Sequence, residues 1–368
     1  MSAVQPPYDD GMFDADALAA LHLFTGCCGQ FQLQRIERVG FSGSSIWKVA
    51  ATEPILLRRF PQPLCLKRWP ADHPPPARLP WIHSVLKQAR DAGLDFVPEI
   101  ILTQQGATTC EVAGSTWELM TWLPGEVDRE RPTSERRIAA AFRALARFHL
   151  ATGAATDRGR ESLATNDSAI IEIHRRQRFP TPDSTPAIVD RIDRLQELQN
   201  GRLSTIRSAV EQRRIREIDD LAQRWRKERS ELPRETIHQL EIHSRGQLPL
   251  QPAIRDLWRD HVLFTGTEVS GFLDFGAMRI DTPLTDLARL IGSLAGDEFT
   301  LRRSAMNAYS ELRPLSPRDV EIIDLLDHTG TFIAGWNWLD WLYVQQREFP
   351  SLAAIRERLS ELLSRRLC

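Results

Sequence analysis

The periodicity of the apolar residues changes once along the chain, between residues 123 and 133, and this change limits the possible fold more than any single motif. Before it, short segments alternate apolar and polar residues, as strands with one buried face do. These segments are residues 31–39, 45–50, 63–69, 97–103 and 115–123, with one helix expected at 81–92. After it, Ile138, Phe142, Leu145 and Phe148 recur at helical spacing. The sequence therefore predicts an α+β protein with a small β-rich N-terminal lobe, residues 1–122, and a larger helical C-terminal lobe, residues 123–368.

The composition is that of an ordinary globular protein. Of 368 residues, 42% are apolar and 26% are charged, and 47 basic against 49 acidic side chains give a net charge of −2. Because there is no basic excess, nucleic acid is not an expected partner. The apolar run near the N-terminus is too short for a signal peptide or a membrane span, and the five cysteines have no metal-site or redox spacing. We therefore expect a cytoplasmic protein that binds neither membranes nor nucleic acid, with its oligomeric state left open.

Residues 155–250 contain no pattern that points to chemistry. The stretch 208–231 is rich in charges of both signs and has Ile218, Leu221 and Trp225 at helical spacing. We interpret it as part of a helical insertion, either a solvated amphipathic helix or a helical hairpin, rather than as a nucleic-acid-binding arm. A protein-interaction arm is the weaker alternative.

Three residues with proton- or metal-binding side chains surround a short hairpin, which is predicted from strands at 261–264 and 269–275. Asp256 precedes the hairpin, His261 begins its first strand and Asp274 lies near the end of its second strand. Such a hairpin brings their side chains to one rim. Phosphoryl transfer needs one carboxylate to orient the attacking hydroxyl and separate ligands for the metal that neutralises the phosphates.

The order and spacing of these residues resemble the aminoglycoside phosphotransferase and choline kinase group, which are relatives of the protein kinases. That group has the loop H-G-D-x-x-x-x-N followed by I-D-F-G or I-D-W-x. Here residues 254–261 read I-R-D-L-W-R-D-H, and residues 273–276 read L-D-F-G. The resemblance implies a two-lobed protein kinase-like fold. It also implies that Asp256 positions and deprotonates the acceptor hydroxyl, and that His261 and Asp274 bind the metal.

The loop departs from the pattern of the group at three positions. Ile254 replaces the first histidine, Arg255 the glycine and His261 the asparagine. Mg²⁺ prefers oxygen ligands, whereas imidazole suits Mn²⁺, Zn²⁺ or Co²⁺ better, so His261 indicates either an altered metal preference or a degenerate site. Asp260 is an alternative oxygen ligand. Asp286 matches the D-L-A segment that braces the catalytic loop in the group.

The β-rich lobe contains counterparts of a nucleotide site. A Gly/Ser turn at 40–45 lies between two expected strands, and Ser42, Gly43 and Ser44 would bind phosphate oxygens through N–H groups and hydroxyls. An ordinary hairpin turn is the alternative interpretation. Lys67 ends the segment L-C-L-K, which resembles the V-A-I-K strand whose lysine holds the phosphates.

Two further features of this lobe bear on nucleotide binding. The group places a glutamate in the following helix to pair with the lysine, but residues 81–92 contain none, and His83 lies near that position. Residues 117–125 resemble the hinge strand, where the main chain from Met120 to Trp122 would contact the adenine.

Together these features predict ATP-dependent transfer of a phosphate to a hydroxyl of a small-molecule substrate. The implied cofactors are ATP and a divalent cation, Mg²⁺ or, because of His261, Mn²⁺ or another metal. The alternative is a pseudokinase, a nucleotide- or metal-binding module without catalysis, which Ile254, His261 and the missing helix glutamate favour. The acceptor is left open, with an antibiotic, an amino alcohol, a sugar and a lipid precursor all compatible.

Overall fold

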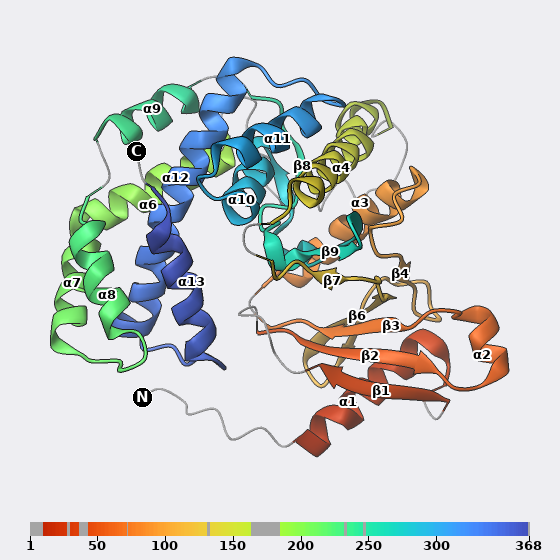
Figure 1. Ribbon diagram of the computed structural model, residues 1–368. Coiled ribbons are helices and arrows are strands. Elements are labelled where there is room, and N and C mark those ends of the chain that lie inside the picture. The colour runs from red at the N-terminus through yellow and green to blue at the C-terminus, as the bar shows by residue number, and fades with distance from the viewer. Residues whose placement is uncertain are drawn as a thin grey trace. The chain divides into compact units, whose positions relative to one another are not determined.

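The computed structural model describes residues 10–27, 30–36, 43–71, 73–130, 133–162, 185–231, 234–245 and 248–366. It separates into two compact units, residues 1–124 and residues 125–368, and Figure 1 labels their elements. The first unit is rich in strands and the second is mostly helical. The α+β class predicted from the sequence is therefore confirmed.

The first unit combines an antiparallel sheet with three α-helices in its described part. The helices are α1 (Asp10–Thr25), α2 (Pro54–Arg59) and α3 (Leu79–Asp91), with a short turn, η1 (Pro76–Arg78). The strands are β1 (Phe31–Ile36), β2 (Ser45–Ala51), β3 (Leu64–Arg68), β4 (Ile100–Ile101), β5 (Cys110–Val112) and β6 (Ser115–Thr121). The strand order is β1-β2-β3-β6-β4, and β5 also pairs with β6. The strand expected at 97–103 is reduced to β4, because Pro98 has no N–H to donate to a ladder.

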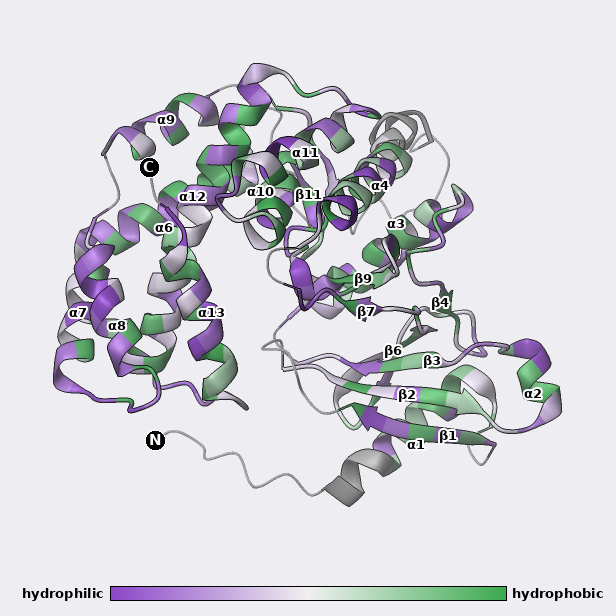
Figure 2. Ribbon diagram, in the orientation of Figure 1, coloured by the Kyte–Doolittle hydropathy of each residue, from purple (hydrophilic) through white to green (hydrophobic). Residues whose placement is uncertain are grey.

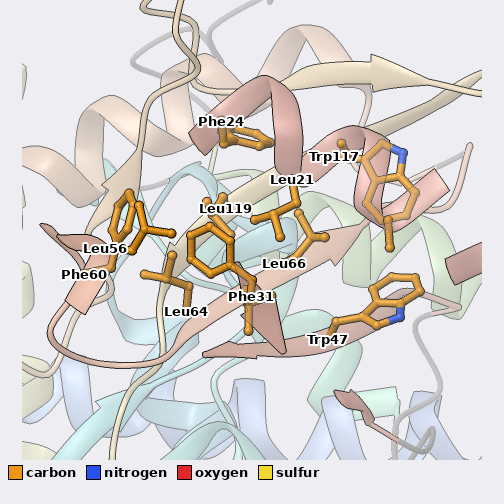
Figure 3. Close-up of a cluster of buried hydrophobic side chains, with 13 residues drawn as sticks. Leu21, Phe24, Phe31, Trp47, Leu56, Phe60, Leu64, Leu66, Trp117 and Leu119 are labelled. Atoms are coloured by element: carbon orange, nitrogen blue, oxygen red, sulfur yellow. The ribbon is translucent and has the colours of Figure 1, made fainter. Parts of the chain in front are cut away.

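The first unit has its core between the sheet and α1 (Figure 3). The strand alternation directs one set of side chains to this face, where they meet the apolar side of α1. The largest members are Leu21, Phe24, Phe31, Trp47, Leu56, Phe60, Leu64, Leu66, Trp117 and Leu119. The sequence interpretation did not assign α1, although Ala17, Ala20, Leu21 and Phe24 recur at helical spacing. The positions that alternate with the core residues, Lys67 and Glu118 among them, belong to the opposite face.

The second unit contains most of the helices. They are α4 (Glu135–Ser162), α6 (Pro186–Glu197), η2 (Leu198–Arg202), α7 (Leu203–Gln212), α8 (Asp219–Glu228), α9 (Arg234–Ser244), α10 (Leu284–Leu294), α11 (Phe299–Ser310), α12 (Pro317–Leu339), η5 (Asp340–Val344) and α13 (Leu352–Ser364). Its strands are β7 (Glu126–Val127), β8 (Gln251–Ala253), β9 (Val262–Thr265), β10 (Glu268–Phe272) and β11 (Arg279–Asp281), with the turns η3 (Arg259–His261) and η4 (Phe275–Ala277). Among the described residues, no helix has the length and apolar character that a membrane span requires.

Helix α12 is the centre of the packing in this unit, since it contacts α6, α7, α9, α10 and α13. Figure 2 shows hydrophobic residues along α10 and α12, whereas hydrophilic residues prevail on α8. Helix α8 turns its few apolar residues inward, and Leu221 and Trp225 are buried. The indole of Trp225 packs directly on the backbone of Gly335 in α12. The part of the 155–250 insertion that is described thus contributes to the core of the second unit.

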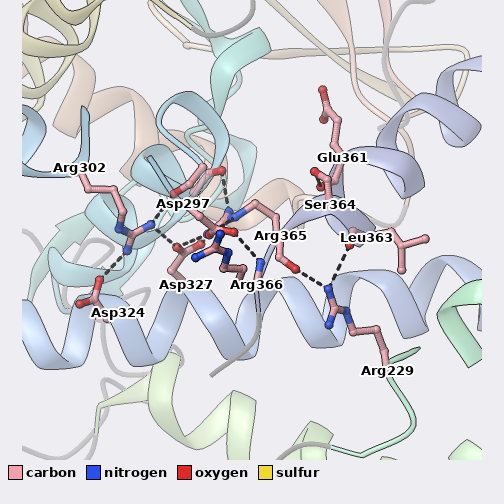
Figure 4. Close-up of polar contacts among 12 residues, drawn as sticks. Arg229, Asp297, Arg302, Asp324, Asp327, Glu361, Leu363, Ser364, Arg365 and Arg366 are labelled. Carbon is pink, nitrogen blue, oxygen red and sulfur yellow. Dashed lines mark hydrogen bonds and ion pairs between the residues drawn. The ribbon is translucent and has the colours of Figure 1, made fainter. Parts of the chain in front are cut away.

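A network of ion pairs ties the end of the chain to α12 (Figure 4). The buried carboxylate of Asp327 accepts hydrogen bonds from Arg302 at 2.8 Å and from Arg365 at 2.7 Å. Arg365 also donates to Asp297 at 2.7 Å and to the C=O of Gly292. Because buried charges are stable only when paired, these contacts fix α10, α11 and the segment after α13 against α12.

We expect the substitution Gly335→Ala to lower the free energy of unfolding by about 1–3 kcal/mol, because overpacking a filled core strains it. The added Cβ would lie 1.9 Å from Cζ2 of Trp225. Gly330→Ala in the same helix is the control, since its Cβ would lie 3.7 Å from the nearest atom, Nη2 of Arg191. Urea unfolding of both variants measures the difference, and equal stabilities would contradict the packing of α8 on α12.

Candidate active site

Strand pairing joins the stretch that contains Asp256 to the stretch that contains Asp274. Strands β9 and β10 pair antiparallel, and just beyond them the N–H of Leu273 donates to the C=O of His261 at 2.9 Å. On the other side, β8 and β11 also pair antiparallel. The three residues predicted for catalysis and metal binding, Asp256, His261 and Asp274, are therefore brought into one region of the second unit.

Both ring nitrogens of His261 form hydrogen bonds within the loop. Nδ1 lies 2.7 Å from the main-chain oxygen of Asp256, and Nε2 lies 3.2 Å from Nε1 of Trp258. A carbonyl oxygen can only accept and an indole N–H can only donate. The imidazole is therefore the tautomer with its proton on Nδ1, and its Nε2 lone pair is directed at the indole. In this arrangement both ring nitrogens are engaged, so a metal could bind His261 only if one of these hydrogen bonds were broken.

Asp256 is held on one side and open on the other. Its Oδ1 accepts from Nε and Nη2 of Arg289 at 3.2 and 3.0 Å. The side chain is 45% exposed, and among the described residues no hydrogen bond reaches Oδ2. One carboxylate oxygen is thus fixed by a guanidinium, while the other is able to accept a proton from a ligand.

Asp274 has a strained backbone, with φ 55° and ψ 74° in the left-handed region. A side chain other than glycine rarely adopts this conformation, and such strain is concentrated at functional sites. Its carboxylate is half-buried at the start of η4. The described part of the chain contains no group of three or more His, Cys, Asp or Glu side chains arranged around one metal position. Any metal held by Asp274 would therefore need ligands from the substrates or from water.

Asp286, at the start of α10, braces the turn before the catalytic loop. Its buried carboxylate accepts the main-chain N–H of Ile254 at 2.8 Å and that of Arg255. Arg255 has φ 66°, which gives the chain the sharp turn that directs Asp256 outward from the core. The position of Asp286 in the D-L-A segment had suggested this bracing role.

His149 of α4 completes the brace, and the sequence interpretation did not identify it. Nε2 lies 3.0 Å from Oδ2 of Asp286, and Nδ1 lies 2.9 Å from the hydroxyl of Tyr309. Burial is the main cause that lowers the pKa of His149 below its usual value, so the neutral form donates from Nε2 and accepts at Nδ1. The apolar Ile254 replaces the loop histidine of the resembling group, and here a histidine from another helix contacts the aspartate. The one available signal was a histidine beside Phe148 on an apolar helix face.

In the first unit, the predicted phosphate loop is described only in part. Ser42 lies outside the described residues. Gly43 is exposed with φ 73°, a conformation that favours glycine, and Ser44 beside it is buried. The loop leads directly into β2, as a phosphate-covering hairpin would.

Lys67 lies opposite a carboxylate that the sequence interpretation did not assign. Its nearest neighbour across the β3–β6 ladder is Glu118, and paired side chains in an antiparallel sheet lie on one face, with Cβ atoms roughly 5 Å apart. Both side chains are buried. Oε2 of Glu118 is 2.8 Å from Nε2 of His83 in α3, the helix that lacks the expected glutamate. Burial raises the pKa of the Cys65 thiol to about 12, with opposing effects from Lys67 and Glu118, so both charges act on this same face.

The predicted hinge is partly occupied by the sheet. The N–H of Trp122 donates to the C=O of Pro63 at 2.9 Å, and the N–H of Thr121 donates to the C=O of Glu99 at 2.9 Å. Met120 pairs with both β3 and β4. While these bonds hold, an adenine could form hydrogen bonds with carbonyl groups here or with the N–H of Leu123, but not with the N–H of Trp122.

We expect the substitution His149→Gln to destabilise the protein by about 1–3 kcal/mol at pH 8, because buried partners lose hydrogen bonds. The pKa of His149 is lowered in the folded state, so the unfolded chain binds more protons as the pH falls below the ordinary value of 6.5. Acid therefore destabilises the wild type through this residue and not the variant. The difference in unfolding free energy should shrink between pH 8 and pH 5 in urea titrations. A difference that grows on acidification would mean that His149 is a cation in the folded protein.

The chain was compared with known proteins. The model of the phosphotransferase enzyme family, APH, matches residues 55–317. A homoserine kinase from Brucella anthropi is 25% identical over 277 residues, which are 74% of this chain and 71% of the relative. Among solved structures, a spectinomycin phosphotransferase in complex with ADP and spectinomycin has a TM-score of 0.60 at 9% identity, covering 90% of this chain and 88% of that one. An amicoumacin kinase in complex with AMP-PNP, Ca²⁺ and Ami has a TM-score of 0.58 at 12% identity, covering 97% of this chain and 94% of that one.

The structural likeness agrees with the predicted kinase-like fold. The family match identifies the chain as a member of the phosphotransferase enzyme family, whose enzymes transfer phosphate to hydroxyl groups of small molecules.

Proposed function

We propose that this phosphotransferase uses ATP as the phosphate donor and that Asp256 accepts the proton of the acceptor hydroxyl. The observation that carries the proposal is the asymmetry of the Asp256 carboxylate. Oδ1 is fixed by two N–H groups of Arg289, whereas Oδ2 is left to meet a hydroxyl. A base that is held by one oxygen is oriented before the substrate arrives, and phosphoryl transfer depends mainly on such positioning.

The ligands available at Asp274 suit a hard cation. Mg²⁺ binds through one or two carboxylates and completes its shell with substrate phosphates and water. The strained carboxylate of Asp274 fits this mode, since the described residues hold no group of three or more His, Cys, Asp or Glu side chains that could enclose a metal. When bound, the cation would neutralise the phosphate oxygens. Because both nitrogens of His261 are engaged, we propose Mg²⁺ rather than a metal that needs imidazole.

His261 is proposed as a positioning residue. Its ring bonds to the main chain at Asp256, and its own C=O accepts from Leu273, next to Asp274. It therefore connects the proton acceptor and the proposed metal ligand through two hydrogen bonds. This role removes one argument for the non-catalytic alternative, because the replacement of asparagine by histidine need not abolish the site.

The nucleotide is proposed to bind the first unit through the loop of Ser42, Gly43 and Ser44, through Lys67 and through the main chain around Met120 to Trp122. The spectinomycin phosphotransferase was solved with ADP and the amicoumacin kinase with AMP-PNP, which supports an adenine nucleotide. We further propose that Glu118 supplies the carboxylate partner of Lys67. In this chain the carboxylate comes from a strand, and His83 of α3 holds it in place.

We expect the substitution Asp256→Asn to lower kcat by about 10²–10⁴-fold, because the amide cannot take the hydroxyl proton. Nucleotide consumption over a panel of hydroxylated metabolites, with Mg²⁺ or Mn²⁺, measures the effect. Asp319→Asn, in the exposed cap of α12, is the matched control and should keep wild-type turnover. If the wild type binds ATP and no acceptor in any metal supports turnover, the non-catalytic module is the better description.

We expect the substitution Glu118→Gln to lower kcat/KM for ATP by roughly 10- to 100-fold, the size of one lost hydrogen bond to a charged group. Nearly all of the change should appear in KM for ATP, with KM for the acceptor unaltered. Glu111→Gln, on exposed β5, is the control. An unchanged KM for ATP in a folded Glu118→Gln protein would remove Glu118 from the nucleotide site.

A further inference from the structure

Four arginines from different elements of the second unit interact electrostatically with one another, and two of them with Asp256. Arg289 of α10 donates to its Oδ1. Arg255 precedes it in the chain, Arg191 belongs to α6 and Arg358 to α13. The proposed mechanism uses only Arg289, to hold Asp256, so the other three have no assigned task.

Two of these cations share one aromatic ring. The guanidinium carbons of Arg289 and Arg358 lie 5.7 and 5.1 Å from the centroid of the Trp258 ring. Nη1 of Arg358 forms an ion pair with the carboxylate of Glu361 at 3.1 Å. Burial first, and the charge of Arg289 second, lower the pKa of Arg358 to about 10. The two guanidinium groups are therefore close enough to repel each other.

The other two cations have donors without acceptors. Arg255 binds Asp190 at 2.7 Å and Asp281 at 3.3 Å, yet its Nη1 is buried without a hydrogen-bond partner. Arg191 donates to the C=O of Ala187 at 2.8 Å, and its Nε is also buried without a partner. Buried donors without an acceptor destabilise the folded state. Burial, followed by repulsion from Arg255, lowers the pKa of Arg191 to about 10.

The carboxylates of the cluster leave some donors of its cations unsatisfied. Asp190 is shared between Arg255 and the exposed Arg279. Asp281 is fully buried, and burial raises its pKa to about 6. Its Oδ2 lies 3.3 Å from Nε of Arg255 but accepts no hydrogen bond. Nη1 of Arg255 and Nε of Arg191 thus have no acceptor among the described residues, and a ligand of opposite charge would supply one.

We propose that the acceptor carries an anionic group, a carboxylate or a phosphate ester, which binds among Arg289, Arg358 and the unpaired donors of Arg191 and Arg255. This inference rests on the proposed function, since it places the acceptor hydroxyl at Oδ2 of Asp256. Arg289 uses Nε and Nη2 for Asp256, and its Nη1 remains for the anion. Because Arg289 would contact the anionic group and also the carboxylate that accepts the hydroxyl proton, the hydroxyl and the anionic group are only a few bonds apart. A polycationic acceptor would be repelled.

The first experiment measures binding and does not depend on turnover. Thermal unfolding is followed with glycerate, glycerol 3-phosphate, homoserine and glycerol, in the presence of Mg²⁺ and AMP-PNP. We expect glycerate, homoserine or glycerol 3-phosphate to raise Tm, and glycerol to have no effect. The anion that raises Tm shows whether the site takes a carboxylate or a phosphate ester. If no anion raises Tm, or if glycerol raises it equally, the inference is wrong.

The second experiment locates the site. Arg358→Gln should abolish the shift in Tm, and Arg358→Lys should restore part of it, because the lysine keeps the positive charge. Arg358 forms no hydrogen bond with Asp256 in the described structure. Arg356→Gln, an exposed arginine of the same helix that pairs with Asp220, should keep the full shift. A shift that survives Arg358→Gln, or that disappears equally in Arg356→Gln, would contradict the site.

The third experiment separates this inference from the proposed function. For an acceptor that is turned over, Arg358→Gln should raise its KM at least 10-fold with little change in kcat, since it removes a charge-assisted contact. A neutral amide of the same acceptor should show a similarly raised KM with the wild type. Anion binding without any turnover would overturn the proposed function and keep the site. Turnover that favours the neutral amide would overturn the anion site and keep the proposed function.

Discussion

The buried carboxylate of Asp286 is the contact on which the catalytic region depends. It accepts hydrogen bonds from the main chain at Ile254 and Arg255 and lies in contact with His149. A buried carboxylate is tolerated only with such a complement of donors. In return, it fixes a turn that includes a positive φ at Arg255. The direction of Asp256, and with it every contact of the proposed acceptor site, follows from this turn.

The same region illustrates how a loop keeps its geometry when its usual residues change. The histidine that the resembling group has in the loop is Ile254 here, and His149 from α4 contacts the aspartate instead. The asparagine of the group is His261, and its ring is engaged at both nitrogens with Asp256 and Trp258. In the first case the imidazole comes from a different part of the chain, and in the second a different side chain at the same position bonds to the main chain of the loop.

The first unit follows the same principle. Lys67 lacks a glutamate in α3, but Glu118 lies directly across the ladder and is held by His83. The arginine cluster near Asp256 differs in kind, because not all of its donors are satisfied. Arg191 and Arg255 each have a buried N–H group without an acceptor, which is unfavourable for stability. Such a cluster is expected where ligand binding, rather than the fold, determines the residues.

The periodicity of the apolar residues was enough to predict the β-rich and helical parts, because burial of one face per element follows directly from spacing along the chain. The order of Asp256, His261, Asp274 and Asp286 was enough to indicate the family, since these residues lie close together in the sequence. The roles of Glu118, His149 and the arginine cluster came only from the tertiary structure. Their partners are distant along the chain, and a side chain that accepts or donates across such a distance leaves no local pattern. The partners of His261, by contrast, are close in the sequence, but only the folded loop shows that its nitrogens bond to Asp256 and Trp258, because these contacts depend on the path of the backbone.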